Sequence, residues 1–190
     1  MRHEGIVTLL LAAVGVDVNS KDDGGRTPLL WAVERGYEGV VTLLLAAEGI
    51  DVNSKDNSGR TPLLCTTLNQ RGGMVKLLLA VGGVDVNSKD NSDRTPLLWA
   101  AMLGYKGIVT LLLAAEGIDV NSKDNSGRTP LLWAVERGYE GVVTLLLAAE
   151  GIDVNSEDNS GQTPLSWAVE NERAGKDDKD TQEGPIGEIS

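Results

Sequence analysis

The sequence contains no phenylalanine, a single cysteine and a single histidine, and aromatic residues make up only 4% of it. With so few aromatic side chains, any hydrophobic core has to be built from aliphatic residues. The single cysteine, Cys65, excludes an internal disulfide framework and favours an intracellular location, the cytoplasm ahead of the nucleus. With His3 as the only histidine, metal clusters and cysteine–histidine catalysis lack their usual groups, so we expect no metal site and no cofactor.

Positive charge is also scarce, with 17 basic against 28 acidic residues and a formal net charge of −11. Because phosphate-rich partners require clustered Lys and Arg, nucleic acid and anionic membranes are disfavoured as partners. No apolar run approaches the roughly 18 residues that a membrane-spanning helix needs. Residues 1–16 have the basic start and apolar run of a secretion signal, but residues 5–13 recur unchanged at 107–115, which favours a repeat helix instead.

Repetition is what the chain has in abundance. The stretch TPLLWAVERGYEGVV occurs at residues 27–41 and again at 129–143. The tripeptide Thr-Pro-Leu recurs with a spacing of 34 residues and begins at Thr27, Thr61, Thr95, Thr129 and Thr163. A fixed period of this length is typical of a solenoid, in which each unit needs its neighbours to bury its apolar face. We therefore predict one elongated array.

Local signals divide each unit into two helices and a long loop. Thr27 is a good N-cap, the proline after it suits the first helical turn, and Gly36 is placed to end this first helix in a left-handed conformation. A second helix is expected over residues 38–47, ended by Gly49, and it is apolar enough to be covered on more than one side. The segment 50–60 is rich in Asn, Asp, Ser and Gly, which predicts an extended polar finger.

The motifs TPL, G-x-x-x-VV-x-LLL and G-I-D-V-N recur in register and resemble the ankyrin repeat over residues 4–173. The tetratricopeptide repeat has the same period, but its W-x-x-L-G-x-x-Y pattern is absent. The resemblance implies an all-α solenoid over residues 1–173, with a half repeat, four full repeats starting near 22, 56, 90 and 124, and a second half repeat. Residues 174–190 carry five acidic and two basic residues without apolar periodicity, and we expect a disordered acidic tail there.

Two departures from the ankyrin pattern matter. The family commonly has His after Thr-Pro-Leu, and here that position holds Leu30, Leu64, Leu98, Leu132 and Ser166, so apolar packing should replace its hydrogen bonds. One extra residue after the leucine triplet explains a period of 34. The motifs TPLLWA and TPLSWA are similar to those in ankyrin arrays of filamentous fungi, which are often attached to nucleotide-binding domains.

The resemblance implies protein binding through the finger tips and the exposed end of each first helix. The corresponding positions are Glu34/Arg35, Leu68/Asn69, Met102/Leu103, Glu136/Arg137 and Glu170/Asn171. The central pairs differ most from the others, and their apolar members would form a patch with a charged rim, which is the usual appearance of a protein-binding site. The alternative is neutral drift with local burial of these side chains.

Rows of basic residues follow the fingers, namely Arg26, Arg60, Arg94 and Arg128 beside Lys21, Lys55, Lys89 and Lys123. We assign Arg60 and Arg94 to the binding surface, where such a row would capture an acidic peptide. The alternative is pairing of both rows with the adjacent Asp22, Asp56, Asp90 and Asp124. The unit from residue 56 differs from the others, since Cys65 replaces Trp, Gln70 replaces Gly and Arg71 replaces Tyr. This unit is either a weak hinge or a site reshaped for a ligand.

The leading hypothesis is a non-catalytic scaffold that binds an unidentified protein on its concave face and finger loops. The alternative is an undiversified spacer or sensor-array fragment of a larger fungal nucleotide-binding ankyrin protein. A hydrolytic enzyme is a remote third reading, because Glu34 and Glu136 should stand roughly 25–30 Å apart, whereas paired carboxylates need about 5–10 Å. We therefore predict no catalytic residues. The two half repeats would complete one unit between two chains, which predicts weak, salt-enhanced head-to-tail self-association opposed by the acidic tail.

Overall fold

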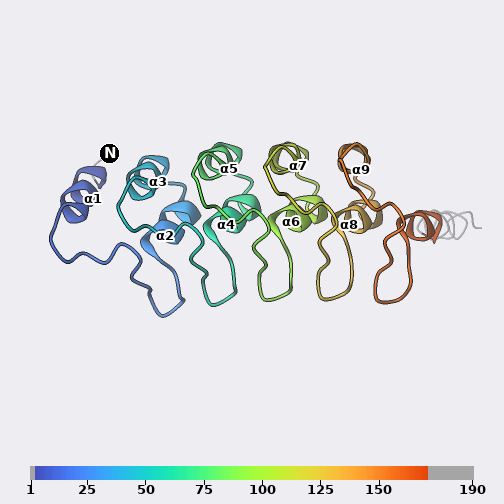
Figure 1. Ribbon diagram of the computed structural model, residues 1–190, viewed down its shortest axis with the longest axis horizontal. Helices are drawn as coiled ribbons and strands as arrows, with labels where there is room; N and C mark the ends of the chain where they lie inside the picture. Colours follow the sequence, from blue (N-terminus) through green and yellow to red (C-terminus); the bar gives the residue numbers. More distant parts are fainter. Residues whose placement is uncertain (1–2, 171–190) are drawn as a thin grey trace, which may run out of the picture.

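The computed structural model describes residues 3–170 and contains only helices and loops within that range, without a strand (Figure 1). Its helices are α1 (Glu4–Leu11), α2 (Pro28–Arg35), α3 (Glu38–Leu45), α4 (Pro62–Leu68), α5 (Gly72–Leu79), α6 (Pro96–Met102), α7 (Lys106–Leu113), α8 (Pro130–Glu136) and α9 (Glu140–Leu147). Residues 164–170 are also helical. Across the described part of the chain, no helix has the length and apolar character needed to cross a bilayer. The acidic tail predicted for residues 174–190 lies outside the described residues.

The helices form two rows in an elongated stack. Figure 1 shows α2, α4, α6 and α8 in an inner row, α1, α3, α5, α7 and α9 in an outer row, and long finger loops projecting on the inner side. Each inner helix packs against the outer helix that follows it and against the next inner helix, as α6 does against α7 and α8. The predicted all-α solenoid of helix-turn-helix units with finger loops is confirmed.

The inner helices begin and end where their local chemistry predicts. The Thr27 side chain accepts a hydrogen bond from the Leu30 N–H at 3.3 Å, and the threonines before α4, α6 and α8 act in the same way. After α2, Gly36 adopts a φ of 80°, the left-handed conformation predicted for it. After α4, Gln70 takes the same role with a φ of 54°, a conformation that a residue with a Cβ adopts at some cost.

The outer helices are two residues shorter than predicted. Helix α3 ends at Leu45, because the Ala47 N–H bonds the Leu44 carbonyl at 3.0 Å and so tightens the chain into a turn. Gly49 follows at a φ of 74° and directs the chain into the finger. The predicted stop at Gly49 therefore belongs to the turn and not to the helix.

The core is aliphatic, as the lack of aromatic residues predicts. The two leucines after each Thr-Pro are almost completely buried, with exposed fractions of 1% or less at Leu29, Leu30, Leu63, Leu64, Leu97, Leu98, Leu131 and Leu132. The leucines that replace the family's histidine are thus part of the core. On the outer helices, exposed fractions are 3% or less at Leu44, Leu78, Leu112 and Leu146. Each unit meets its neighbours through these side chains.

Asparagine and lysine side chains join successive fingers. Asn87 donates from Nδ2 to the Gly117 carbonyl at 2.7 Å and accepts from the Asp119 N–H at 2.9 Å. The same pair of bonds occurs at Asn19, Asn53 and Asn121. The Nζ atoms of Lys21, Lys55, Lys89 and Lys123 each donate to the carbonyl of the residue 34 positions later. The pairing of these lysines with the aspartates is therefore wrong, because their reach is along the array.

The asparagine bridges offer a matched test. Replacing Asn87 by Ala removes two hydrogen bonds, and we expect the free energy of unfolding to fall by about 1–3 kcal/mol. The side chain of Asn155 occupies the same position in the last finger but has no such partner among residues 3–170, so Asn155→Ala should change stability by less than about 0.5 kcal/mol. Urea unfolding followed by circular dichroism measures both. Equal losses in the two variants would contradict the bridging role.

Candidate functional site

The residues assigned to partner binding lie in one row at the C-terminal ends of the inner helices. Glu34 and Arg35 close α2, and the later pairs are the last residue and the C-cap of α4, α6 and α8, namely Leu68/Asn69, Met102/Leu103 and Glu136/Arg137. Arg60 and Arg94 stand in the loops before α4 and α6. Of the pair Glu170/Asn171, Glu170 is exposed and Asn171 lies outside the described residues.

The three apolar members of this row are less exposed than an open patch would be. The side chains of Leu68, Met102 and Leu103 are each half-buried, while Asn69 and Arg137 beside them are exposed. Glu34 and Glu136 at the equivalent positions are half-buried too, so burial does not distinguish the apolar members of the row from the charged ones.

A recurring arrangement of Asp, Arg and Trp underlies the row. Each inner-helix Trp donates its Nε1–H to the aspartate nine residues earlier, as Trp31 does to Asp22 at 2.9 Å. The guanidinium of Arg26 lies 3.7 Å from the centre of the Trp31 ring, a cation–π contact. Hydrogen bonds from the backbone N–H of Arg26, and from the side chains of Arg26 and Trp31, lower the pKa of Asp22. The constant nine-residue spacing between Asp and Trp is the sequence pattern from which this arrangement could have been predicted.

Glutamates at the outer parts of the row neutralise the nearby arginines. Glu34 lies 3.5 Å from Arg26 and 3.7 Å from Arg60, so one carboxylate serves two successive units. Arg128 lies 2.8 Å from Glu136 and 3.8 Å from Asp158. The predicted pairing of arginines with the aspartate four residues earlier holds for Arg26, at 3.0 Å, and for Arg60, at 2.6 Å.

Arg94 differs from the other arginines of the row. Glu34 lies beside Arg26 and Arg60. By the 34-residue period, the residues at the corresponding places beside Arg94 are Leu68 and Met102. Arg94 makes no ion pair with any residue in the range 3–170, whereas the other three arginines of the row do. Its Nε, like that of Arg128, is buried without a hydrogen-bond partner. Its guanidinium stacks 4.7 Å from the centre of the Trp99 ring. Among the residues that the structure describes, the middle of the row thus holds a positive charge without a carboxylate at ion-pair distance, next to two apolar side chains.

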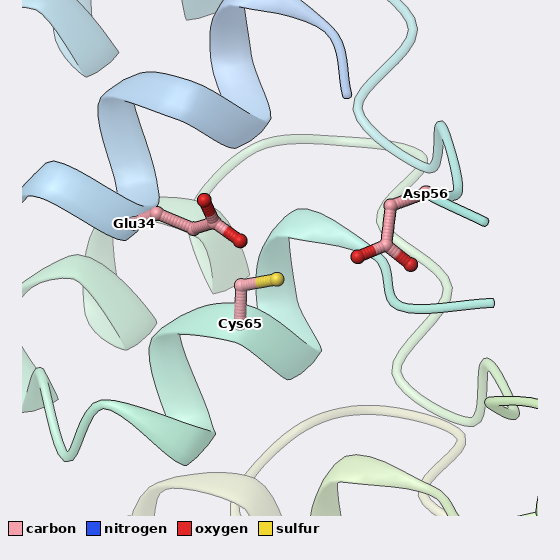
Figure 2. A group of neighbouring side chains, drawn as sticks. All are labelled: Glu34, Asp56 and Cys65. Atoms are coloured by element: carbon pink, nitrogen blue, oxygen red, sulfur yellow. The ribbon is translucent and has the colours of Figure 1, made fainter. Parts of the chain in front are cut away.

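Next to this row, Glu34, Asp56 and Cys65 come together at the junction of two units. One ligand atom from each lies within 4.8 Å of the others, and Figure 2 shows Glu34 on α2, Cys65 on α4 and Asp56 on the preceding loop. Burial raises the pKa of the Cys65 thiol to about 12, so its sulfur stays protonated and is a poor metal ligand. Arg60 already contributes a positive charge, at 2.6 Å from Asp56 and 3.7 Å from Glu34. We interpret the group as an ion pair between units.

The substitution of Trp by Cys65 explains why Arg60 is needed here. Asp56 has no indole donor, and its Oδ2 receives both Nε, at 2.8 Å, and an amino group of Arg60. Its side chain is only 2% exposed, so without Arg60 a charged oxygen would be left buried. In the next unit, Asp90 receives the Trp99 Nε1–H at 2.8 Å and does not depend on Arg94.

Truncation of the two arginines tests this difference. We expect Arg60→Ala to lower the free energy of unfolding by about 2 kcal/mol more than Arg94→Ala, because only the former leaves a buried carboxylate unpartnered. The two changes remove the same aliphatic atoms, so each serves as the control for the other. Urea unfolding at pH 7 provides the values, and equal losses would show that Asp56 does not depend on Arg60.

Thiol reactivity tests the state of Cys65. Since its pKa is raised from 9.0 to about 12, the folded protein should react with an aromatic disulfide reagent at pH 8 about a thousandfold more slowly than the chain in urea. Because the unfolded thiol ionises above pH 9.0 and the folded one does not, the stability from this group falls as pH rises from 9.0 toward 12. Absorbance of the released thiol follows the reaction. Immediate labelling of the folded protein would contradict its burial.

Comparison with known proteins is consistent across sequence and structure. A family model described as ankyrin repeats, in three copies, matches residues 1–90, 48–124, 69–158 and 117–177. The chain is also similar to the crystal structure of EF0377, an ankyrin repeat protein, with a TM-score of 0.82 and 26% sequence identity over 96% of this chain and 94% of that one. No curated protein sequence gives a significant match.

Proposed function

Because the chain belongs to the ankyrin-repeat family, whose repeats are generally protein–protein interaction modules, we propose that it is a non-catalytic scaffold for a protein partner. The partner would bind the concave face and the finger loops, along the row at the inner-helix ends. The contact residues are Glu34, Arg35, Arg60, Leu68, Asn69, Arg94, Met102, Leu103, Glu136 and Arg137. The ankyrin fold is typically non-catalytic. Of the side chains that could take part in catalysis, Glu34 pairs with two arginines and the Cys65 thiol is buried.

The environment of Arg94 carries this proposal. The guanidinium of Arg94 has no carboxylate at ion-pair distance among residues 3–170, stacks on Trp99 and is flanked by Leu68 and Met102, which favours a partner group that is acidic and lies next to apolar atoms. Arg and aromatic side chains at the centre of a surface are typical of residues that dominate binding energy. The charged pairs on either side, Glu34/Arg35 and Glu136/Arg137, would form the polar rim. We therefore infer that the partner presents an Asp or Glu carboxylate beside an apolar side chain.

A charge-matched pair of variants tests the role of Arg94. Once a partner has been identified by affinity capture from the source cells, Arg94→Gln should weaken its binding by about ten- to hundredfold, the effect of one hydrogen bond to a charged group. Lys106→Gln removes the same charge from the exposed face of α7 and should leave the affinity unchanged. Titration calorimetry gives both dissociation constants. Equal affinities for Arg94→Gln and the wild type would place the contact elsewhere.

The apolar half of the site needs its own variant. Replacing Leu68, Met102 and Leu103 together by Glu introduces repulsion against an acidic partner and removes the apolar surface. Because these side chains are half-buried, circular dichroism and thermal unfolding have to show that the variant is folded before binding is compared. A folded variant that binds with wild-type affinity would mean that this row is not the contact surface.

A second candidate function is favoured by one observation. Residues 27–54 and 129–156 are identical, so much of the array has not diversified toward separate contacts. This suits a spacer or sensor-array fragment of a larger fungal nucleotide-binding ankyrin protein, without a dedicated partner. The flanking genomic sequence discriminates between the two functions. In-frame repeats beyond Met1 or Ser190 favour the spacer, and flanks without repeats contradict it.

A further inference from the structure

The two ends of the described array expose side chains that the interior of the array buries. Leu10 on α1 is 56% exposed, whereas the equivalent leucines of α3, α5, α7 and α9 are at most 3% exposed. Leu165 is 74% exposed, whereas the equivalent leucines of α2, α4, α6 and α8 are at most 1% exposed. In a complete unit these two positions share one core, as Leu97 and Leu112 do. The two ends therefore present the two halves of one intramolecular contact.

A groove lies at the end that carries α1. It has a volume of about 910 Å³ and is lined by Val7 and Leu10 of α1 together with Trp31, Ala32 and Arg35 of α2. Within the array, an inner helix packs between the outer helix that follows it and the next inner helix, as α4 does with α5 and α6. The groove between α1 and α2 is the corresponding place for an inner helix that would precede α1.

The other end of the chain carries a helix of the required sequence. Residues 164–170 read PLSWAVE, and α8, which fills this position in a complete unit, reads PLLWAVE. The two differ only at Ser166, which stands at the position of Leu132. We propose that residues 164–170 of one chain dock into the α1–α2 groove of a second copy, so that two chains complete one unit head to tail. This inference does not depend on the proposed partner.

Polar groups at the two ends also match in the 34-residue register. Asn121 bridges to the Gly151 carbonyl at 2.7 Å and the Asp153 N–H at 2.8 Å. One unit later, Asn155 would meet the equivalent groups of the second copy, the carbonyl of its Gly15 and the N–H of its Asp17. By the same register Glu170, which corresponds to Glu34, would face Arg26 of the second copy, as Glu34 faces Arg60 at 3.7 Å.

Two acidic residues make this contact weaker than a junction inside the array. Asn57, Asn91 and Asn159 donate from Nδ2 to the preceding finger, but Asp23 stands at the equivalent position and has no donor to offer. Glu157 stands at the position of the four bridging lysines and removes another donor. Each chain also carries a net charge of −11. The association should therefore strengthen with salt, since the screening length falls from about 10 Å at 0.1 M to about 3 Å at 1 M.

The geometry of the contact leads to a test by complementation. A head-to-tail contact uses different surfaces on the two partners, so the wild type should form open chains that lengthen with concentration. Leu10→Glu blocks the groove and Leu165→Glu blocks the docking helix, and both side chains are exposed, so the fold should be kept. Each variant alone should stay monomeric. An equimolar mixture should form a dimer and stop there, because the Leu10→Glu chain offers an intact helix and the Leu165→Glu chain an intact groove.

Sedimentation velocity of the 190-residue chain at 0.1 M and 1 M NaCl, over a range of concentrations, measures these states. Val14→Glu is the matched control, because Val14 is fully exposed, does not line the groove, and is Glu at positions 48, 116 and 150. It should associate like the wild type. A variant without residues 174–190 should associate more strongly, since it loses three net negative charges. Wild-type chains that remain monomeric at every concentration and salt, single variants that associate like the wild type, or a mixture that stays monomeric would each overturn the proposal.

Discussion

Burial of leucine side chains between neighbouring units is the interaction on which the rest of this structure depends. The helices span seven or eight residues, a length at which a helix in water is not stable alone. Each inner helix buries the first leucine after Thr-Pro, such as Leu97, against its own outer helix and the adjacent unit. At Leu165 those neighbours are missing among the described residues, and the same leucine is 74% exposed. Since the stack is held by aliphatic contacts that repeat with little change, it sets a constant spacing for everything attached to it.

That constant spacing is what lets the fingers use backbone carbonyls as partners. A side chain such as Asn87 or Lys89 reaches the next finger at the same distance each time, so the bonds recur along the array. Single hydrogen bonds of this kind are worth about 1 kcal/mol each, so they align the fingers while the buried core holds the stack together. Among the described residues, the neutralisation of charge departs from the repeating pattern at Cys65 and around Arg94. Both interruptions lie in the central units, and both change how a charge is neutralised.

The sequence was sufficient for the period, the helix-turn-helix unit, the threonine caps and the left-handed glycine, because each depends on residues close in the chain. The predicted pairing of the lysines with aspartates was wrong. The aspartate is next to the lysine in the sequence, whereas the carbonyl that accepts the hydrogen bond comes close only when the units stack. The half-burial of Leu68 and Met102 also depends on neighbouring units. The sequence assigns Arg94 to the site, but its lack of an ion-pair partner among the described residues is found only when three units are compared in space. Whether this row binds a partner stays a prediction.

The Glu34 carboxylate pairs with both Arg26 and Arg60, so the neutralisation of charge depends on the order of the units. An arginine in one unit is neutralised by a glutamate that belongs to the unit before it, and Asp56 relies on its own arginine because Cys65 stands where a tryptophan would donate. Units with nearly the same sequence therefore cannot be exchanged without a change in the ion pairs. Exchanging the unit from residue 56 with the unit from residue 90 during gene rearrangement would place Arg94 directly after the unit of Glu34 and so give it a carboxylate, while Arg60 would keep its pair with Asp56. Recombination among such repeats can thus create or neutralise a surface charge while the scaffold is preserved.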